Sequence, residues 1–367
     1  MIADKLRRLT AFLTALVLSF AAAVTASAAK KSTEPTEYDV TDKNAERVIA
    51  DFVEEYAVNS DTVAVGYKNL VTGETALFHE DYFAFEASLY KLPLNMYWAE
   101  KVYEGEITMD EPVGNNTLEY VQRRSLVNSN NPLSERLVEK IGSFSDFRRI
   151  AGRFYGMTEE EIEEPDYLKK RTNCVSRLLC CLEMLYDEPE RYPGVLECMM
   201  EAQPTEFFRT FEDRFPIAQK YGSVADFSVS FPVNAAGILY TDDPFLLVVL
   251  SEQKSLSSKT IGILAQRLCD YTQLSREARI EREKEEAEAK RRSFELAERE
   301  RLAEEAERQA AEAAEAGKTA AAAAALAQQS AERKRKETAA HGGILWAGFA
   351  VSLLALTLIF RKKDKEE

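Results

Sequence analysis

The stretch SLYKLPL (Ser88–Leu94) decides how this sequence is interpreted. Ser88 and Lys91 are three residues apart, so a helix that starts here places both side chains on one face, with Cβ atoms about 5–6 Å apart. The residues around Lys91 are apolar, whereas a surface helix start is seldom so apolar. Because burial lowers the pKa of a lysine, the stretch predicts a serine nucleophile beside its base. The alternative is a serine that caps a helix, followed by a surface lysine.

The second motif is Ser129-Asn130-Asn131, which is followed by Pro132. Proline is favoured at the first position of a helix, so the motif is predicted to lie where a loop enters a helix. There Ser129 would relay a proton and Asn131 would contact a substrate amide. The alternative is that Asn131 caps the helix, and one side chain cannot easily perform both tasks.

The third motif is Lys220-Tyr221-Gly222-Ser223, which is predicted to begin a strand along which an extended substrate lies. All four residues are candidate substrate contacts, and the glycine lets a ligand approach the backbone closely. Lys220 would be a second cation, and the Ser223 amide would donate to an oxyanion together with the Ser88 amide. The alternative is a turn that leads into an edge strand.

Together the motifs supply a nucleophile, a base, a hydroxyl relay and a second cation, the set that acyl transfer through a serine ester needs without histidine. The chain has two histidines, His79 and His341, and no G-x-S-x-G elbow, which argues against a histidine triad. Its five cysteines have neither zinc-site spacing nor an even number, so they are predicted to be buried thiols, with one disulfide still open. No metal and no organic cofactor is predicted.

Both ends of the chain are predicted to be non-globular. Residues 1–28 combine basic residues, an apolar run and a small-residue cleavage pattern, which is typical of a secretory signal peptide; a first transmembrane helix is the alternative. Residues 29–41 are predicted to be a linker. Residues 342–360 are apolar enough to span a bilayer, and the basic start of the tail 361–367 places that tail in the cytoplasm. We therefore expect an exported protein, anchored to the cell membrane by its C-terminal helix.

Residues 42–274 are predicted to form one α/β domain of the α+β type. Early and late strands must pair in one largely antiparallel sheet, because neither set is stable alone, and the helices between them form an inserted helical half. A cleft between sheet and helical half is the expected place for a site. The expected strands are Thr62–Tyr67, Thr75–Phe85, Val224–Ser230, Ala236–Tyr240 and Phe245–Leu250, and the expected helices are 48–56, 89–102, most of 131–211 around a loop at Thr158–Arg171, and 258–271.

Residues 275–341 consist almost wholly of Glu, Arg, Lys, Ala and Gln and predict a long solvated helix, a stalk that would span about 100 Å. Large apolar residues are few and follow no sustained heptad, so a coiled coil with weak self-association is only the alternative. The net charge of the whole chain is −15, from 47 basic and 62 acidic residues. Such an acidic chain without a basic stripe is a poor nucleic-acid binder.

In this order and on these elements, the three motifs resemble the S-x-x-K, S-D-N and K-T-G set of class A β-lactamases and penicillin-binding proteins. The resemblance covers about residues 42–274, and the segments AAGILY (235–240) and PFLLVVL (244–250) are similar to the family's final strands. It implies a β-lactamase or DD-peptidase-like fold. For the site it implies an acyl-enzyme on Ser88, Lys91 as base, Ser129 as relay, and Lys220 and Asn131 as substrate contacts.

The sequence departs from that family pattern at two motif positions. Asn130 replaces the aspartate of S-D-N, and Tyr221 replaces the threonine of K-T-G, whose hydroxyl would bind the substrate carboxylate. The segment EPDYL (164–168) resembles the family's E-P-E-L-N loop but lacks its asparagine. The resemblance implies that Glu164 activates the water for deacylation; an acidic loop that happens to contain Glu-Pro is the alternative.

The expected function is that of a membrane-anchored serine hydrolase of the class A β-lactamase type, acting on β-lactams or related amides. One alternative is a DD-peptidase-like enzyme, for which the substrate is a D-alanyl peptide of peptidoglycan. The other is a catalytically impaired module that binds the cell wall or senses β-lactams.

Overall fold

The computed structural model describes residues 37–340, except 58, 224–231 and 254–255. The predicted signal peptide, most of the predicted linker, the predicted transmembrane helix and the tail lie outside the described residues and stay predictions. In the part of the chain that is described, no helix is both long and apolar enough to cross a membrane.

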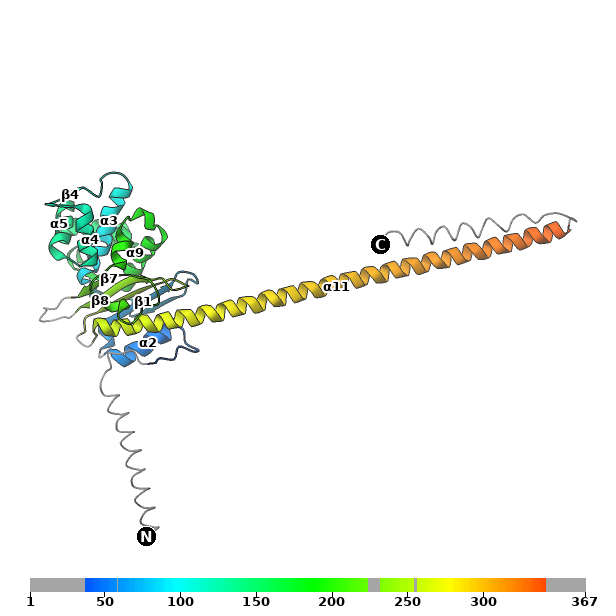
Figure 1. Cartoon of the computed structure of the whole chain (residues 1–367), viewed down its shortest axis with the longest axis horizontal. Coiled ribbons are helices and arrows are strands. Elements are labelled where there is room, and N and C mark those ends of the chain that lie inside the picture. Colours follow the sequence, from blue (N-terminus) through cyan, green and yellow to red (C-terminus); the bar gives the residue numbers. More distant parts are fainter. Residues whose placement is uncertain (1–36, 58, 224–231, 254–255, 341–367) are drawn as a thin grey trace, which may run out of the picture. The chain divides into compact units, whose positions relative to one another are not determined.

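One five-stranded antiparallel sheet organises the domain, with the strand order β2-β1-β9-β8-β7 (Figure 1). Strand β9 is the central strand in this order. All of its residues are buried, as expected for a strand that is covered on both faces. The register pairs Val65 of β1 with Val249 of β9, so the predicted pairing of early and late strands is confirmed. The strands are β1 Val63–Asn69, β2 Thr75–Phe78, β7 Ile217–Ser223, β8 Val233–Leu239 and β9 Phe245–Ser251.

Two strand predictions need correction. The expected strand Thr75–Phe85 is two strands, because the chain turns after β2, where His79 has a φ of +54°, and then forms the short β3 (Ala84–Phe85). The third motif does not begin a strand but lies in the second half of β7, which starts directly after Pro216, a residue without an amide to donate. The expected strand Val224–Ser230 lies outside the described residues.

Helices fill most of the chain between β3 and β7, as predicted for 89–102 and 131–211, and residues 103–130, for which no element was predicted, contain a further helix. The predicted loop Thr158–Arg171 nevertheless contains two short helices, because Thr158 forms a capping box with Glu161 and Pro165 opens the second helix. The elements are α2 Ala45–Tyr56, η1 Ser60–Thr62, η2 Ala87–Tyr90, α3 Lys91–Tyr103, β4 Pro112–Val113, β5 Asn116–Thr117, α4 Leu118–Val127, α5 Asn131–Ile141, α6 Phe144–Phe154, α7 Glu159–Ile162, α8 Pro165–Lys169, β6 Thr172–Asn173, α9 Val175–Asp187, η3 Pro189–Arg191, α10 Val195–Met200 and η4 Phe207–Arg209.

The two faces of the sheet carry separate apolar cores. Successive residues of a strand point to opposite faces, so Val248 packs with the helices of the inserted half and Val249 packs with α2 and the start of α11. The helical half lies over one face of the sheet in Figure 1, and α2 lies on the other. The predicted layered α+β architecture is therefore confirmed, and β7 forms the edge of the sheet beside the helical half.

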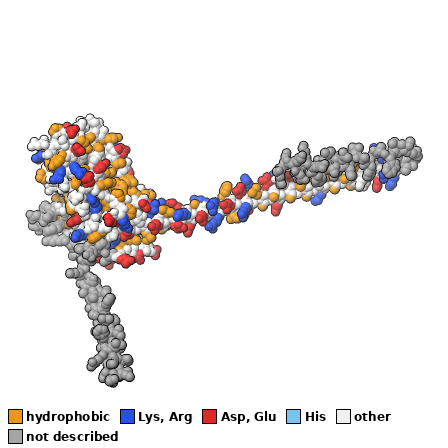
Figure 2. Space-filling view, in the orientation of Figure 1, with side chains coloured by type: hydrophobic (Ala, Val, Ile, Leu, Met, Phe, Trp, Pro, Cys, Tyr) orange, Lys and Arg blue, Asp and Glu red, His pale blue; other side chains and the backbone are white. Residues whose placement is uncertain are grey.

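The last helix differs from its prediction because it does not end near residue 271. Helix α11 runs continuously from Ser258 to Ala340, since neither proline nor a helix-ending glycine interrupts it. The compact unit extends to Glu281, where Arg276 and Arg279 still pair with Asp243. Beyond it, acidic and basic side chains alternate along the exposed helix (Figure 2), and pairs such as Arg292 with Glu288 support it locally.

Candidate active site

Ser88 lies in η2, directly after a strained backbone position. Ala87 has a φ of +49°, a conformation that non-glycine residues rarely adopt and that persists only where the surroundings enforce it. Ser88 is half-buried and is not a helix cap, because Glu86 and Tyr90 occupy the cap positions of η2 and α3. The capping alternative for Ser88 is therefore wrong.

Lys91 is fully buried at the start of α3. Its Nζ donates to the backbone carbonyl of Ser129 at 2.6 Å, to Ser129 Oγ at 3.2 Å and to Asn131 Oδ1 at 2.5 Å. Burial lowers the pKa of Lys91 to about 8, while the charge of Glu135 acts in the opposite direction. Lys91 is thus the predicted buried lysine with a lowered pKa and not a surface residue.

Ser129 joins the two lysines of the site. Its hydroxyl oxygen lies 3.2 Å from Lys91 Nζ and 3.1 Å from Lys220 Nζ, although Lys220 comes from a distant strand. The backbone of Ser129 is also held at positive φ, +52°, which turns the loop before α5 into the site. The position between two ammonium groups is the one that a proton relay requires.

The two asparagines after Ser129 have different roles: one caps helix α5 and the other contacts Lys91. Asn130 is the N-cap of α5, and its side chain accepts a hydrogen bond from the amide of Leu133 at 3.0 Å. Asn131 is therefore free to contact Lys91, and the alternative that Asn131 caps the helix is wrong. Asparagine and aspartate cap helices about equally well, so Asn130 retains the capping task at that motif position.

Lys220 brings β7 into the same site. It is fully buried, and its Nζ donates to the carbonyl of Tyr221 at 2.6 Å as well as to Ser129. Burial, and then repulsion from Lys91, hold the pKa of Lys220 well below its ordinary value. Two ammonium groups that share one hydroxyl acceptor cannot both be charged without cost.

Gly222 brings the β7 backbone close to residues 86–88, which we call the nucleophile turn. A Cβ atom added to Gly222 would lie 2.8 Å from the Ser88 amide nitrogen and 3.0 Å from the Glu86 carbonyl oxygen. Only glycine allows this approach without displacing backbone atoms. The next residue, Ser223, is exposed at the end of the strand, where its amide is the second candidate oxyanion donor.

A model of the β-lactamase enzyme family matches residues 44–272. The chain belongs to the β-lactamase enzyme family. Its fold is similar to that of the TLA-1 extended-spectrum β-lactamase, with 16% identity, a TM-score of 0.53, and coverage of 63% of this chain and 99% of the other.

Two further solved structures show the same β-lactamase fold. A β-lactamase from Chitinophaga pinensis has 16% identity and a TM-score of 0.53, and the match covers 63% of this chain and all of the other. A class A β-lactamase from Bacteroides cellulosilyticus has 13% identity and a TM-score of 0.52, with 63% and 99% covered. No curated protein matches the chain.

Tyr221 shows how this chain departs from the β-lactamase motif. Its hydroxyl donates to the Gln203 carbonyl and its ring stacks on Phe207 at 4.9 Å between centroids, within the core on the α2 side of the sheet. The hydroxyl is therefore not brought together with Ser88 and Lys91. Strand alternation directs Tyr221 and Lys220 to opposite faces of β7. Lys220 Nζ nevertheless lies 4.2 Å from the Tyr221 ring centroid, so the ring contacts this lysine while the hydroxyl is bound to Gln203.

Glu164 makes no hydrogen bond to Ser88 or Lys91 in the described part of the chain. It is exposed at the N-terminus of α8, and no hydrogen bond within the described residues joins its carboxylate to the site. Its role in deacylation stays a prediction. The carboxylate that does influence Lys91 is Glu135, one helical turn after Asn131. The sequence contained a signal for it, since residues four apart share a helix face.

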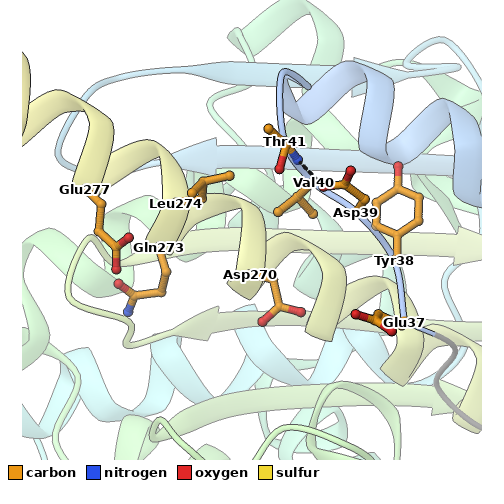
Figure 3. A pocket seen from close by; sticks show the side chains of 9 residues that line it. All are labelled: Glu37, Tyr38, Asp39, Val40, Thr41, Asp270, Gln273, Leu274 and Glu277. Carbon is orange, nitrogen blue, oxygen red and sulfur yellow. Dashed lines mark hydrogen bonds between the residues drawn. The ribbon is translucent and has the colours of Figure 1, made fainter.

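A pocket of about 700 Å³ lies away from the site, between residues 37–41 and the start of α11 (Figure 3). Tyr38 closes onto the domain there by donating to Asp51 at 2.8 Å, so this end of the predicted linker is docked. The lining is acidic and contains no lysine, histidine or cysteine, and none of the three sequence motifs contributes to it.

Cysteines and acidic groups add no further chemistry to the site. All five cysteines are free thiols, and all but Cys180 are buried, as predicted; the disulfide that the sequence left open does not form. No group of histidine, cysteine and carboxylate side chains in the described residues could hold a metal ion.

Proposed function

We propose that this chain is a serine hydrolase that forms an acyl-enzyme through Ser88 with β-lactams or related amides. The hydrogen-bonded chain from Lys91 through Ser129 to Lys220, beside Ser88, is the observation that carries the proposal. This chain of side chains supplies a base and a proton relay without histidine, and it supports the proposal because Ser88 is only three residues before Lys91.

The first chemical step follows from these positions. Neutral Lys91 takes the Ser88 hydroxyl proton while Ser88 Oγ forms a bond to the substrate carbonyl carbon, and the amides of Ser88 and Ser223 stabilise the oxyanion. The amide C–N bond then breaks, and the leaving nitrogen receives a proton through Ser129. The Lys91 proton is thereby returned, so the base is neutral again when the acyl-enzyme has formed.

The second step is hydrolysis of the ester on Ser88, and we propose Glu164 as the group that activates water. Glu164→Gln is then expected to form the acyl-enzyme at the normal rate and to trap it. Mass spectrometry of the intact protein after addition of a β-lactam measures both rates. Unchanged deacylation in this variant would remove Glu164 from the mechanism.

The exposure of Glu164 supports a second candidate function. Without a positioned carboxylate, the ester would persist, as expected for a DD-peptidase-like enzyme that acts on D-alanyl peptides of peptidoglycan or for a module that senses β-lactams. Both candidates share the acylation of Ser88. In either case we propose an exported protein with a C-terminal membrane anchor at 342–360, and a stalk from 275 to 341.

Labelled penicillin and nitrocefin separate these functions. Covalent labelling with rapid turnover of nitrocefin is expected for the hydrolase, and a stable adduct without turnover for the second candidate. Ser88→Ala should abolish both signals, since the nucleophile is gone. If the wild-type chain neither forms an adduct nor turns over nitrocefin, acyl transfer on Ser88 is wrong.

A further inference from the structure

Glu86 is a fully buried carboxylate two residues before Ser88, and no motif accounts for it. Its two oxygens have different partners: Arg148 Nη1 donates to Oε1 at 2.8 Å, and Asn173 Nδ2 donates to Oε2 at 3.0 Å. Burial raises the pKa of Glu86, and the charge of Arg148 opposes that shift. A buried ion pair of this kind is costly to build, so its place beside the nucleophile needs a reason.

Arg148 also holds the segment that follows α6. Its Nε donates to the Tyr167 carbonyl at 3.0 Å, and its Nη2 donates to the Thr172 carbonyl at 3.1 Å. Tyr167 returns a hydrogen bond from its hydroxyl to the Arg148 carbonyl at 2.8 Å, and the guanidinium lies 4.0 Å from its ring centroid. Arg148 thereby joins residues 158–173, which we call the 158–173 segment, to α6, where Arg149 also pairs with Glu163 at 2.9 Å and Ser145 Oγ donates to the Leu168 carbonyl at 3.3 Å.

The backbone of Glu86 connects the same segment to the nucleophile turn. Its amide donates to the Arg171 carbonyl at 2.9 Å, and its carbonyl accepts from the Leu89 amide at 3.0 Å. The strained Ala87 follows directly, and Ser88 comes next. A positive φ at alanine persists only where neighbouring contacts over-determine it, and Glu86 supplies contacts from both its backbone and its side chain.

We propose that Glu86 is a positioning residue for Ser88, and that its ion pair with Arg148 couples the nucleophile turn to the 158–173 segment. The inference rests on the proposed acylation of Ser88. Glu86 does not touch substrate; it keeps Ala87 in its strained conformation and so keeps the Ser88 hydroxyl and amide aligned with Gly222. Loss of the carboxylate charge leaves Arg148 buried without its counter-ion, which lets the turn relax. Misplacement of a nucleophile by about 1 Å can cost about 10²-fold in rate.

The chain offers a matched control for a buried ion pair outside the site. Glu100 is 2% exposed on α3, nine residues after Lys91, and pairs with Arg153 and with Arg191, whose Nε lies 2.8 Å from Oε1. Glu100→Gln and Glu86→Gln are the same chemical change at two buried carboxylates, with the difference that the arginine partners of Glu100 are 36–46% exposed and Arg148 is 1% exposed. Both are expected to lower the Tm, so the fall in stability alone does not distinguish them.

The test measures the rate of acylation by labelled penicillin over a series of concentrations up to saturation. The plateau gives the acylation rate constant, and the concentration at half of the plateau gives the affinity of the first complex. For Glu86→Gln we expect that rate constant to fall at least about tenfold with an unchanged affinity, whereas Glu100→Gln should stay within about twofold of wild type. Should Glu86→Gln not fold, Glu86→Asp keeps the charge one methylene shorter, and the same loss is expected. A folded Glu86 variant that acylates at the wild-type rate overturns the inference.

Hydrogen exchange gives a second readout that does not depend on any substrate. Peptides that cover residues 84–91 and 165–173 should exchange faster in Glu86→Gln, and not in Glu100→Gln, because only the former releases both segments. If wild-type protein takes no penicillin label, the proposed function fails, and exchange alone then decides the coupling. Unchanged exchange in both peptides contradicts it.

Discussion

Lys91 and Lys220 donate to the same hydroxyl, Ser129 Oγ, from 3.2 and 3.1 Å. Both ammonium groups are fully buried, and burial lowers the pKa of each. Repulsion between them adds to the effect at Lys220. The charge of Lys91 therefore disfavours the charged form of Lys220, and the Ser129 hydroxyl connects the two amines.

The pH dependence of acylation should report Lys91. Only its neutral form accepts the Ser88 proton, and with a pKa of about 8 that form makes up about a tenth of the protein at pH 7. The acylation rate constant should therefore rise about tenfold per pH unit below 8 and level off above it. Stopped-flow acylation between pH 5.5 and pH 9.5 measures this profile, after the stability of the fold has been checked across the range. A profile that is flat through pH 8 would show that Lys91 is not the base.

Glu135 should shift that profile. Its charge raises the pKa of Lys91, so Glu135→Gln is expected to lower that pKa and move the rising limb to lower pH. Because Glu135 is exposed, the shift should be small, about 0.1–0.5 pH units, with slightly faster acylation at pH 7. Glu139→Gln, one turn further along α5, is the control and should leave the limb in place. A limb that moves to higher pH in Glu135→Gln would contradict the assignment.

The sequence could predict the site because its central residues come in short motifs with strong local constraints. Ser88 and Lys91 are fixed by one helical turn, and Asn130 is fixed by the cap it forms before Pro132. Convergence of Lys220 on Ser129 also depends on the position of β7 at the sheet edge, and here the sequence predicted only that early and late strands share one sheet.

Other features could not be predicted because they depend on contacts between distant residues. The ion pair of Glu86 with Arg148 joins residues 62 apart, and a lone buried carboxylate has no sequence pattern. Strand alternation directs Tyr221 to the face opposite Lys220, whereas the sequence prediction made both residues substrate contacts. Helix α11 continues past Tyr271 because the end of the domain is not an end of the helix: the Glu-, Arg- and Ala-rich residues that follow also favour helix.

Gly222 should tolerate no side chain. In Gly222→Ala the new Cβ would meet the Ser88 amide nitrogen at 2.8 Å, so the turn or β7 must move and acylation should fall by about 10²-fold or more. Gly66→Ala is the control, because its Cβ would also meet an atom at 2.8 Å, but that atom is the end of the flexible Leu179 side chain. We expect Gly66→Ala to lower the Tm and to acylate normally once folded. Equal acylation rates in the two variants would mean that the close contact between Gly222 and the Ser88 amide does not position the nucleophile.

The hydroxyl of Tyr221 should matter to stability and not to catalysis. Tyr221→Phe removes its donor to the Gln203 carbonyl and should lower the free energy of unfolding by about 1–2 kcal/mol. Tyr67→Phe is the matched control, since that hydroxyl also forms a buried hydrogen bond, to Thr272 at 3.0 Å, in the same core. Urea unfolding should give losses of similar size in both variants, and acylation by labelled penicillin should be unchanged in both. If Tyr221→Phe alone weakens the first complex with penicillin, the hydroxyl must leave Gln203 and bind substrate, in place of the threonine of the family motif.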